Sequence, residues 1–281
     1  MAMGADGVQS LVRAALEEDS AGHDVTTQAL IDPQWQGRGT FLMKAKGVLA
    51  GLFVAEAVFR EVDSDLRFTS MVDEGAAVRG GQTVAVVEGS LASILVGERV
   101  ALNFLQHLSG IATLTARYVR AVAETGARIL DTRKTTPGLR RLEKQAVAAG
   151  GGRNHRMDLG DAILIKDNHI AAVRARGATL RGVIERARTS SELSLEVEVT
   201  SVEEAREAAE AGVEMVLLDN MGPDEMREAV VAVAGRCETE ASGGITLRTV
   251  KAVAETGVDY ISVGALTHSP RALDISLKIE G

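Results

Sequence analysis

The chain has 281 residues, of which 46% are hydrophobic and only 3% aromatic, and its formal net charge is −8. This length is enough for one large domain or two smaller ones, and the composition predicts a core of Ala, Val, Leu and Ile between layers of strands and helices. An acidic chain without a general excess of Lys and Arg is not expected to bind nucleic acid.

Neither the N-terminus nor the most apolar stretch predicts a membrane protein. The longest nearly apolar run, residues 48–59, contains Glu56 and is too short to cross a bilayer. The N-terminus has no basic region followed by an apolar one, so we expect no signal peptide. Cys237 is the only cysteine and cannot form an internal disulfide, which fits a reducing compartment. We therefore expect a cytoplasmic protein.

The first 125 residues predict a small mixed domain followed by a long helix. Apolar spacing indicates short helices at residues 10–18 and 54–61 and extended segments at 39–50, 67–72 and 83–88. Residues 91–125 then carry the longest helical pattern, which we interpret as the connection between two domains. Gly110 interrupts this pattern, which predicts a kink or a close approach of another segment.

From residue 127 onward, short apolar runs alternate with helical segments. Such alternation predicts parallel βα units. There are six alternations rather than eight, and no Gly-x-Gly-x-x-Gly opens the first helix, so we predict an incomplete α/β barrel rather than an open sheet. The tail, residues 272–279, alternates like a strand that returns to the N-terminal sheet. The apolar runs are residues 129–130, 162–165, 195–199, 215–218, 239–241 and 260–263, and three of the helices are 202–211, 223–233 and 247–256.

Positive charge is concentrated in one segment of this acidic chain. Residues 128–156 contain eight Lys or Arg and two Asp or Glu, a net charge of +6. Such a segment suggests a polyanionic ligand, although a solvated helix face is the common alternative.

Ionisable residues follow several of the predicted strands. In α/β barrels, catalytic groups lie at the carboxyl ends of the strands. Arg133, Arg156 and Lys166 could surround a small dicarboxylate, because guanidinium groups match carboxylates in a bidentate way. His155 could donate a hydrogen bond to the same ligand, although a single His more often has a structural role. Lys166 could instead form a Schiff base with a carbonyl substrate.

The remaining strand ends suggest a phosphate and a metal or sugar site. The late loops Ser242-Gly243-Gly244 and Gly264 suit phosphate, because glycines let backbone N–H groups approach anionic oxygens; a plain tight turn is the alternative. Glu198 and Asp219 follow neighbouring strands and could hold a divalent cation or sugar hydroxyls, or stabilise an oxocarbenium ion. Either one could instead cap a helix or pair with a lysine.

Several motifs, in order along most of the chain, give the sequence a specific resemblance. The motifs are residues 98–103 (ERVALN), 109–113 (SGIAT), 131–135 (DTRKT), 151–156 (GGRNHR), 165–169 (IKDNH), 196–199 (EVEV), 218–220 (LDN), 240–245 (EASGGI) and 262–268 (SVGALTH). With these motifs the sequence resembles the quinolinate phosphoribosyltransferase family, the decarboxylating enzymes of NAD biosynthesis.

The resemblance implies a fold, an assembly and a reaction. It implies an N-terminal α/β sandwich over residues 1–110, to which the tail 270–281 returns, and an incomplete α/β barrel of six or seven strands over residues 111–269. It implies a homodimer, or a higher oligomer, with each active site shared between subunits. It also implies transfer of a phosphoribosyl group from phosphoribosyl pyrophosphate to quinolinate, with Mg²⁺ as cofactor. The products would be nicotinate mononucleotide, pyrophosphate and CO2.

The resemblance also assigns roles to particular residues. Quinolinate would be held by Arg133, His155, Arg156 and Lys166, together with Arg99 from the neighbouring subunit. Lys134, Glu198 and Asp219 would be catalytic and address the phosphoribosyl donor, with Glu198 and Asp219 binding the metal directly or through water. The phosphate region would be lined by Ser242, Gly243, Gly244, Gly264 and His268, beside Lys134.

Three alternatives stay open from the sequence. A relative with the same fold could use another ring, as nicotinate phosphoribosyltransferase or a molybdenum-operon homologue would; the several cations favour a dicarboxylate. A Schiff-base aldolase would use Lys166 as nucleophile. A non-catalytic phosphometabolite-binding protein would leave Glu198 and Asp219 without a purpose.

Overall fold

The computed structural model describes residues 4–280, which fall into two compact units. The first unit comprises the chain up to residue 116 together with residues 135–151 and the segment from 266 onward. The second comprises residues 117–134 and 152–265. Across residues 4–280, no helix combines the length and the apolar character needed to cross a membrane.

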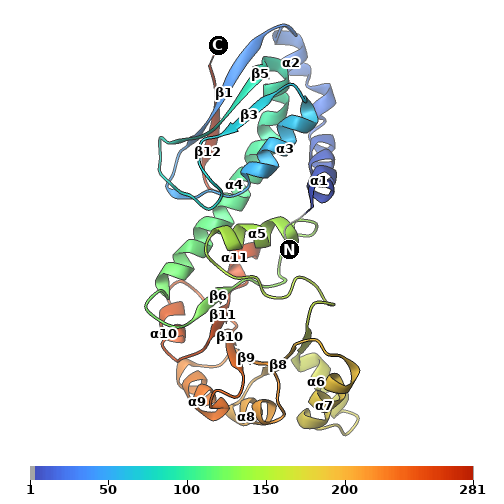
Figure 1. Cartoon of the computed structure of the whole chain (residues 1–281), viewed down its shortest axis with the longest axis vertical. Helices are drawn as coiled ribbons and strands as arrows, with labels where there is room; N and C mark the ends of the chain where they lie inside the picture. The colour runs from blue at the N-terminus through green and yellow to red at the C-terminus, as the bar shows by residue number, and fades with distance from the viewer. Residues whose placement is uncertain (1–3, 281) are drawn as a thin grey trace. The chain divides into compact units, whose positions relative to one another are not determined.

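The first unit is built on an antiparallel sheet with the order β12-β1-β5-β3 (Figure 1). The C-terminal strand β12 lies along β1, with Phe41 opposite Leu277, so the alternating tail is a strand of this sheet. The four strands are β1 (Gln36–Met43), β3 (Arg67–Ser70), β5 (Thr83–Ser90) and β12 (Ile275–Glu280), and a two-stranded ladder pairs β2 (Gly47–Val48) with β4 (Ala77–Val78).

Aromatic side chains fix helix α3 to this sheet. Phe59 of α3 contacts Phe41 of β1 and Phe68 of β3, with ring centroids 5.9 Å apart. Phe41 and Phe59 are buried, so these rings form the centre of an apolar core. The helices of this unit are α1 (Ala5–Glu18), η1 (Ala21–His23), α2 (Val25–Leu30), α3 (Leu52–Val62), α5 (Arg140–Ala149) and the greater part of α4 (Leu91–Ala121).

Gly110 lies inside α4 where another segment crosses it closely. A Cβ on Gly110 would overlap the backbone carbonyl of Arg271. The predicted close approach is therefore confirmed, and only glycine fits there without a shift of the backbone.

The second unit contains a six-stranded parallel sheet with the order β6-β11-β10-β9-β8-β7. The strands β6 and β7 are its two edges, so the barrel is incomplete, which confirms the predicted fold class. The strands are β6 (Arg128–Leu130), β7 (Ile163–Ile165), β8 (Leu195–Val199), β9 (Met215–Asp219), β10 (Glu238–Ser242) and β11 (Tyr260–Ser262).

The strands of this sheet separate apolar from polar residues by alternation. In β8, Val197 and Val199 are buried and have the opposite parity to Glu196 and Glu198. The register places Glu198 beside Leu217, and Leu217 beside Glu240 on the other side. One face of the sheet is thus apolar, and the other carries the polar residues of the site described below.

Helices cover the outside of the parallel strands, as Figure 1 shows for α8, α9 and α10. Local capping explains two of the helix starts: Ser201 accepts a hydrogen bond from the N–H of Glu204, and Pro223 occupies the first turn of α9. The helices are α6 (Asp167–Arg174), α7 (Leu180–Ser190), α8 (Val202–Glu210), α9 (Pro223–Val233) and α10 (Val250–Ala254), and the short α11 (Ala265–His268) follows β11.

Candidate active site

A cavity of about 590 Å³ opens at the carboxyl ends of the parallel strands in the second unit. This volume suits a small-molecule ligand. It is lined by Thr132, Arg133, Lys134, His155, Arg156, Leu164, Lys166, Glu198, Leu217, Asp219, Asn220, Glu240, Ser242, Gly243, Gly244 and Ser262.

Asp131 organises one wall of this cavity from inside the protein. Its carboxylate is fully buried and accepts hydrogen bonds from Asn154 Nδ2 at 2.6 Å and from the backbone N–H of His155 at 2.9 Å. Residue Arg153 extends the sheet beyond β6 through a parallel bridge to Leu130. The buried aspartate therefore fixes the segment that carries His155 and Arg156 against the end of β6.

Three cations line the cavity from different elements. Arg133 follows β6, Arg156 follows the bridge segment, and Lys166 follows β7. Burial, and then repulsion by Arg133, lower the pKa of Arg156, although an arginine stays protonated at any physiological pH. Two guanidinium groups that repel each other in a cavity favour an anionic ligand between them.

Glu198 and Asp219 bring carboxylates to the same cavity. Glu198 Oε2 lies 3.1 Å from Lys166 Nζ, so each of the two oppositely charged groups offsets the other. Asp219 accepts a hydrogen bond from Asn220 Nδ2 at 2.8 Å. Carboxylate and amide oxygens are the ligands that Mg²⁺ prefers, so this donor set fits that ion.

The loop after β10 approaches Asn220 so closely that a side chain would not fit. Gly243 has a φ of 91°, and a Cβ there would overlap the Asn220 side chain. Gly244 also has a positive φ, of 62°, and is exposed at the cavity. A glycine loop of this kind lets backbone N–H groups approach anionic oxygens, as a phosphate requires.

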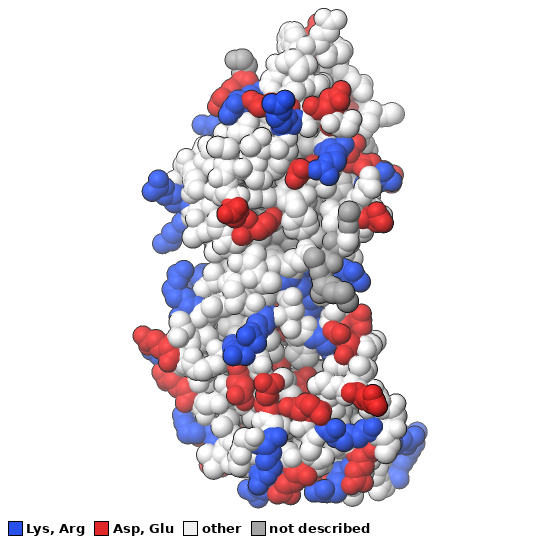
Figure 2. Space-filling view, viewed as in Figure 1, with Lys and Arg blue, Asp and Glu red and all other residues white. Residues whose placement is uncertain are grey.

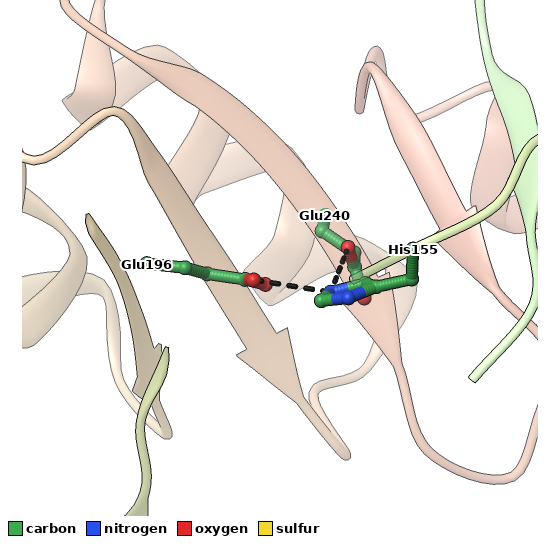
Figure 3. A group of neighbouring side chains, drawn as sticks. All are labelled: His155, Glu196 and Glu240. Carbon is green, nitrogen blue, oxygen red and sulfur yellow. Dashed lines mark ion pairs between the residues drawn. The ribbon is translucent and has the colours of Figure 1, made fainter. Parts of the chain in front are cut away.

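At the wall of the cavity, the ring of His155 faces the carboxylates of Glu196 and Glu240 (Figure 3). Its Nε2 is 3.0 Å from Glu196 Oε2 and 3.4 Å from Glu240 Oε2. The side chains of Glu196 and Glu240 are 7% and 1% exposed. Glu196 Oε1 has no hydrogen-bond partner among the described residues, whereas Glu240 Oε2 has its ion pair with His155. The group is therefore rich in negative charge.

The protonation of His155 is set by opposing neighbours. The backbone N–H of Arg156 donates to Nδ1 at 2.7 Å, which places the ring proton on Nε2 and opposes a second proton. Burial also lowers the pKa of His155, but hydrogen bonds and charges of Glu196 and Glu240 outweigh it and raise the pKa to about 10. Burial raises the pKa of the Glu196 carboxyl, and its hydrogen bond with His155 offsets part of that rise.

Sequence reasoning missed Glu196 and Glu240 as site residues. The sequence pattern singles out only the last polar residue of each strand, namely Glu198 in β8 and Ser242 in β10. Side chains two residues apart on a strand point to the same face. The parity of Glu196 with Glu198, and of Glu240 with Ser242, was the signal that could have found them.

The structure does not place every predicted site residue in the cavity. Gly264 belongs to the second unit and is absent from the cavity wall given above. Arg99 and His268 belong to the first unit, where the Arg99 side chain is 60% exposed and His268 Nδ1 lies 2.6 Å from Ser269 Oγ. Their predicted roles stay predictions.

The basic segment 128–156 does not form one cluster. Arg133, Lys134 and Arg156 line the cavity, whereas Arg128 begins β6 at the other end of that strand. The cations of α5 lie in the first unit, and one of them, Lys144, is fully buried. On the face drawn in Figure 2, Lys and Arg are interspersed with Asp and Glu.

The fold and this cavity define a class of site: an incomplete α/β barrel that holds small anionic ligands at the carboxyl ends of its strands. Models of the two domains of quinolinate phosphoribosyl transferase match the chain, the N-terminal domain over residues 24–109 and the C-terminal domain over residues 111–278. The chain belongs to the quinolinate phosphoribosyltransferase family.

Individual relatives agree along nearly the whole chain. A probable nicotinate-nucleotide pyrophosphorylase (carboxylating) of Synechocystis is 45% identical over 94% of this chain and 90% of its own. A mitochondrial quinolinate phosphoribosyltransferase (decarboxylating) of Nicotiana glauca is 43% identical over 97% of this chain and 82% of its own. The crystal structure of NadC from Streptococcus pyogenes is 42% identical, covers 100% of this chain and 99% of its own, and superimposes with a TM-score of 0.94.

Proposed function

We propose that this protein transfers the 5-phosphoribosyl group of phosphoribosyl pyrophosphate to quinolinate in de novo NAD biosynthesis. The transfer is coupled to decarboxylation and gives nicotinate mononucleotide, pyrophosphate and CO2. The observation that carries the proposal is the convergence of cations, carboxylates and a glycine loop in one cavity. Arg133, Arg156 and Lys166 suit a dicarboxylate, while Glu198 and Asp219 suit a sugar or a metal beside phosphate.

The acceptor is bound by charge. Quinolinate carries two carboxylates, and Arg133, Arg156 and Lys166 present three positive groups to them. A guanidinium can hold a carboxylate through two parallel hydrogen bonds, which orients the pyridine as well as binding it. Oriented in this way, the ring nitrogen can approach the anomeric carbon of the donor without a general base, because an aromatic nitrogen has no proton to lose.

The phosphoribosyl donor binds on the other side of the cavity from the three acceptor-binding cations. Lys134 and the loop from Ser242 to Gly244 provide a cation and backbone N–H groups for phosphate oxygens. Glu198 and Asp219 offset the positive charge that develops on the ribose carbon as pyrophosphate departs. An Mg²⁺ ion held by these carboxylates, directly or through water, would neutralise charge on the leaving pyrophosphate.

Decarboxylation follows from the first step. Once the ring nitrogen is bonded to ribose it carries a positive charge. The bond from C2 to its carboxylate can then break, because the electron pair left on C2 lies beside that charge. CO2 departs, and C2 takes a proton to give nicotinate mononucleotide.

The proposed assembly is a homodimer, or a higher oligomer, in which Arg99 completes the quinolinate site of the neighbouring subunit. Among residues 4–280, the ion pair of Arg99 is a long one, 4.0 Å from Glu98, and its side chain is 60% exposed, so it is accessible to a partner. The proposed location is the cytoplasm, because the only cysteine has no internal partner and needs no oxidising compartment.

The ion pair of Lys166 bears on the aldolase alternative. A Schiff base forms from a neutral amine, whereas Lys166 Nζ is paired with Glu198 at 3.1 Å. An ion-paired lysine suits the binding of an anionic ligand better than attack on a carbonyl.

The test is a product assay on the purified protein. The protein is incubated with phosphoribosyl pyrophosphate, Mg²⁺ and quinolinate labelled in the 2-carboxylate, and both labelled CO2 and nicotinate mononucleotide are measured. Equal amounts of the two products are expected, and none without the donor. Nicotinate in place of quinolinate is the matched control. Turnover of nicotinate with no use of quinolinate would overturn the proposal.

A further inference from the structure

Asn220 lines the cavity directly after Asp219, and no step of the proposed reaction uses its side chain. Its backbone has a φ of 54°, in the left-handed region that residues other than glycine rarely adopt. Among residues 4–280, the other non-glycine residues in this region are Ser20 and Ala234, and neither of them lines the cavity. Strained backbone of this kind gathers at binding sites, where the surrounding contacts hold it in place. The strain at Asn220 therefore suggests a role in the site.

The backbone of Asn220 ends the pairing of β9 with β10. In the register of these two strands, Asp219 lies opposite Ser242. One further hydrogen bond, from the backbone N–H of Asn220 to the carbonyl oxygen of Ser242 at 3.0 Å, extends the ladder past Asp219. Asparagine tolerates the left-handed conformation better than most residues do. The backbone of Asn220 is thus held in one place between two strand ends.

The side-chain amide of Asn220 contacts both of these strand ends. Its Nδ2 donates a hydrogen bond to Asp219 Oδ2 at 2.8 Å, and the nitrogen is the only end of an amide that can donate to a carboxylate. The amide oxygen therefore faces the glycine loop, where it occupies the place that a Cβ on Gly243 would need. One amide thus contacts the carboxylate at the end of β9 and the loop after β10.

We propose that Asn220 is a positioning residue for the phosphoribosyl donor. Its Nδ2 holds the Asp219 carboxylate in one orientation, with Asp219 Oδ2 occupied and Oδ1 left to the donor or its metal ion. Its amide oxygen fixes the separation between that carboxylate and the loop at Gly243. The inference rests on the proposed function for the identity of the donor, but donor binding is measured without any acceptor.

The physical reason for such a residue is the order that ligand binding otherwise has to create. A carboxylate on a rotatable side chain loses conformational entropy when a ligand orders it. The hydrogen bond from Asn220 orders Asp219 in the free protein, so this cost does not fall on donor binding. The ribose and the phosphate of one donor molecule also need partners at a fixed separation. The contact of the amide with the loop at Gly243 sets that separation within the protein.

Two substitutions separate the side chain of Asn220 from its backbone. Asn220→Gly removes the amide and adopts the left-handed conformation without strain, whereas Asn220→Ala removes the amide and keeps the strain. Ala234→Gly is the matched control, because Ala234 has a φ of 53°, is exposed at the end of α9 and does not line the cavity. The control and Asn220→Gly gain similar backbone freedom.

The main measurement is the affinity for phosphoribosyl pyrophosphate with Mg²⁺, by isothermal titration calorimetry in the absence of acceptor. We expect Asn220→Gly to bind the donor about tenfold more weakly than wild type, because a hydrogen bond to a charged group is lost. Ala234→Gly should bind it as wild type does, and quinolinate should bind equally well to all three proteins. Donor binding by Asn220→Gly that equals the wild type overturns the proposal, even if Asn220→Ala is impaired. An equal loss of quinolinate affinity overturns it too, because it indicates general damage to the cavity.

A second background tests whether Asn220 acts through Asp219. In Asp219→Ala there is no carboxylate for the amide to hold, so the further change Asn220→Gly should weaken donor binding by less than about twofold. A further loss as large as that in wild type means that Asn220 contacts the donor itself, and it would refute a positioning role.

The contact between Asn220 and the loop is tested without any ligand. Gly243→Ala should lower the melting temperature more in wild type than in Asn220→Gly, because the amide that the new Cβ would overlap is missing from the variant. Equal shifts in the two backgrounds contradict the contact. A wild-type protein that binds the donor but does not use quinolinate contradicts only the proposed function, whereas equal donor binding by wild type and Asn220→Gly contradicts only the positioning role.

Discussion

Two strands, one in each unit, are buried to a similar extent but with different residues. In β5, the buried run is Val84, Ala85, Val86 and Val87. All five residues of β8 are buried as well, yet two of them are Glu196 and Glu198. Burial of apolar groups stabilises a fold, whereas burial of carboxylates opposes folding unless cations compensate them. The sheet of the first unit thus stabilises the fold through apolar burial, whereas the sheet of the second unit carries the charged side chains of the site.

The difference is sharpest at the inner faces of the two sheets. In the first unit, Phe41 and Phe59 meet at the interface of β1 and α3. In the second unit, the inner face of the strands carries Glu198, Asp219 and Glu240. The compensating cations come from segments that follow the strands, as Lys166 does. Strand and loop residues therefore form the site together.

The largest expected effect is on the stability of the first unit. Phe59→Ala removes a fully buried ring from the aromatic group, and we expect it to lower the free energy of unfolding by about 3–5 kcal/mol. Chemical denaturation measures this loss. Phe53→Ala on the same helix, where the ring is 36% exposed, should cost less than about 1 kcal/mol. Equal losses in the two variants would contradict the assignment of the core.

The second prediction is that, in the second unit, substitutions lower activity strongly and stability hardly at all. Arg133→Ala and Lys166→Ala should each lower kcat/KM for quinolinate about 100-fold, because a charge-assisted hydrogen bond is worth about 1.5–3 kcal/mol. Thermal unfolding should hardly change. Arg128→Ala is the matched control, since Arg128 is exposed at the opposite end of β6 from Arg133. Unchanged steady-state kinetics in both Arg133→Ala and Lys166→Ala would remove the acceptor site from this cavity.

The third prediction concerns the glycine loop. Gly243→Ala should raise KM for the phosphoribosyl donor about tenfold, because a strained residue at positive φ costs about 1–2 kcal/mol and here also displaces Asn220. Gly212→Ala has a similar φ, 82°, and open space around it, so it shares the strain without touching the site. If the two variants bind the donor equally well, the loop does not hold phosphate.

The smallest expected signal, a partial recovery of activity, tests the proposed sharing of a site between subunits. Arg99→Ala and Lys134→Ala should each be inactive alone. Mixed and allowed to exchange subunits, they should recover about a quarter of wild-type activity, because half of the dimers are hybrid and each hybrid has one intact site. Subunit exchange that occurs without any recovery of activity would refute a shared site.

Much of the second unit could be predicted because each of its strands is a short apolar run between helices. All six strands lie within a residue or two of the predicted runs, and α9 spans the predicted residues 223–233.

In the first unit, the helix α5 was not predicted, because Glu143 and Lys144 are buried in it and break the apolar pattern. Burial of a charged residue depends on partners far away in the sequence, which periodicity does not reveal.

The sequence predicted the site residues at the ends of the strands but not those inside the strands. Residues at the ends of strands, such as Lys166 and Asp219, were identified because a strand end has a fixed place in a parallel barrel. The deeper Glu196 and Glu240 were not, since an ionisable residue inside a strand is ordinarily a solvated one. Net charge alone was a poor guide, because the basic segment contributes to two units.

The central claim is that one cavity at the strand ends takes the dicarboxylate acceptor between its cations. The most direct measurement is a crystal structure of this protein with quinolinate bound. The account predicts both carboxylates of quinolinate within hydrogen-bonding distance of Arg133, Arg156 or Lys166, and its ring nitrogen turned toward Glu198 and Asp219. Quinolinate bound outside the cavity, or with its carboxylates facing Glu198 and Asp219, would contradict it.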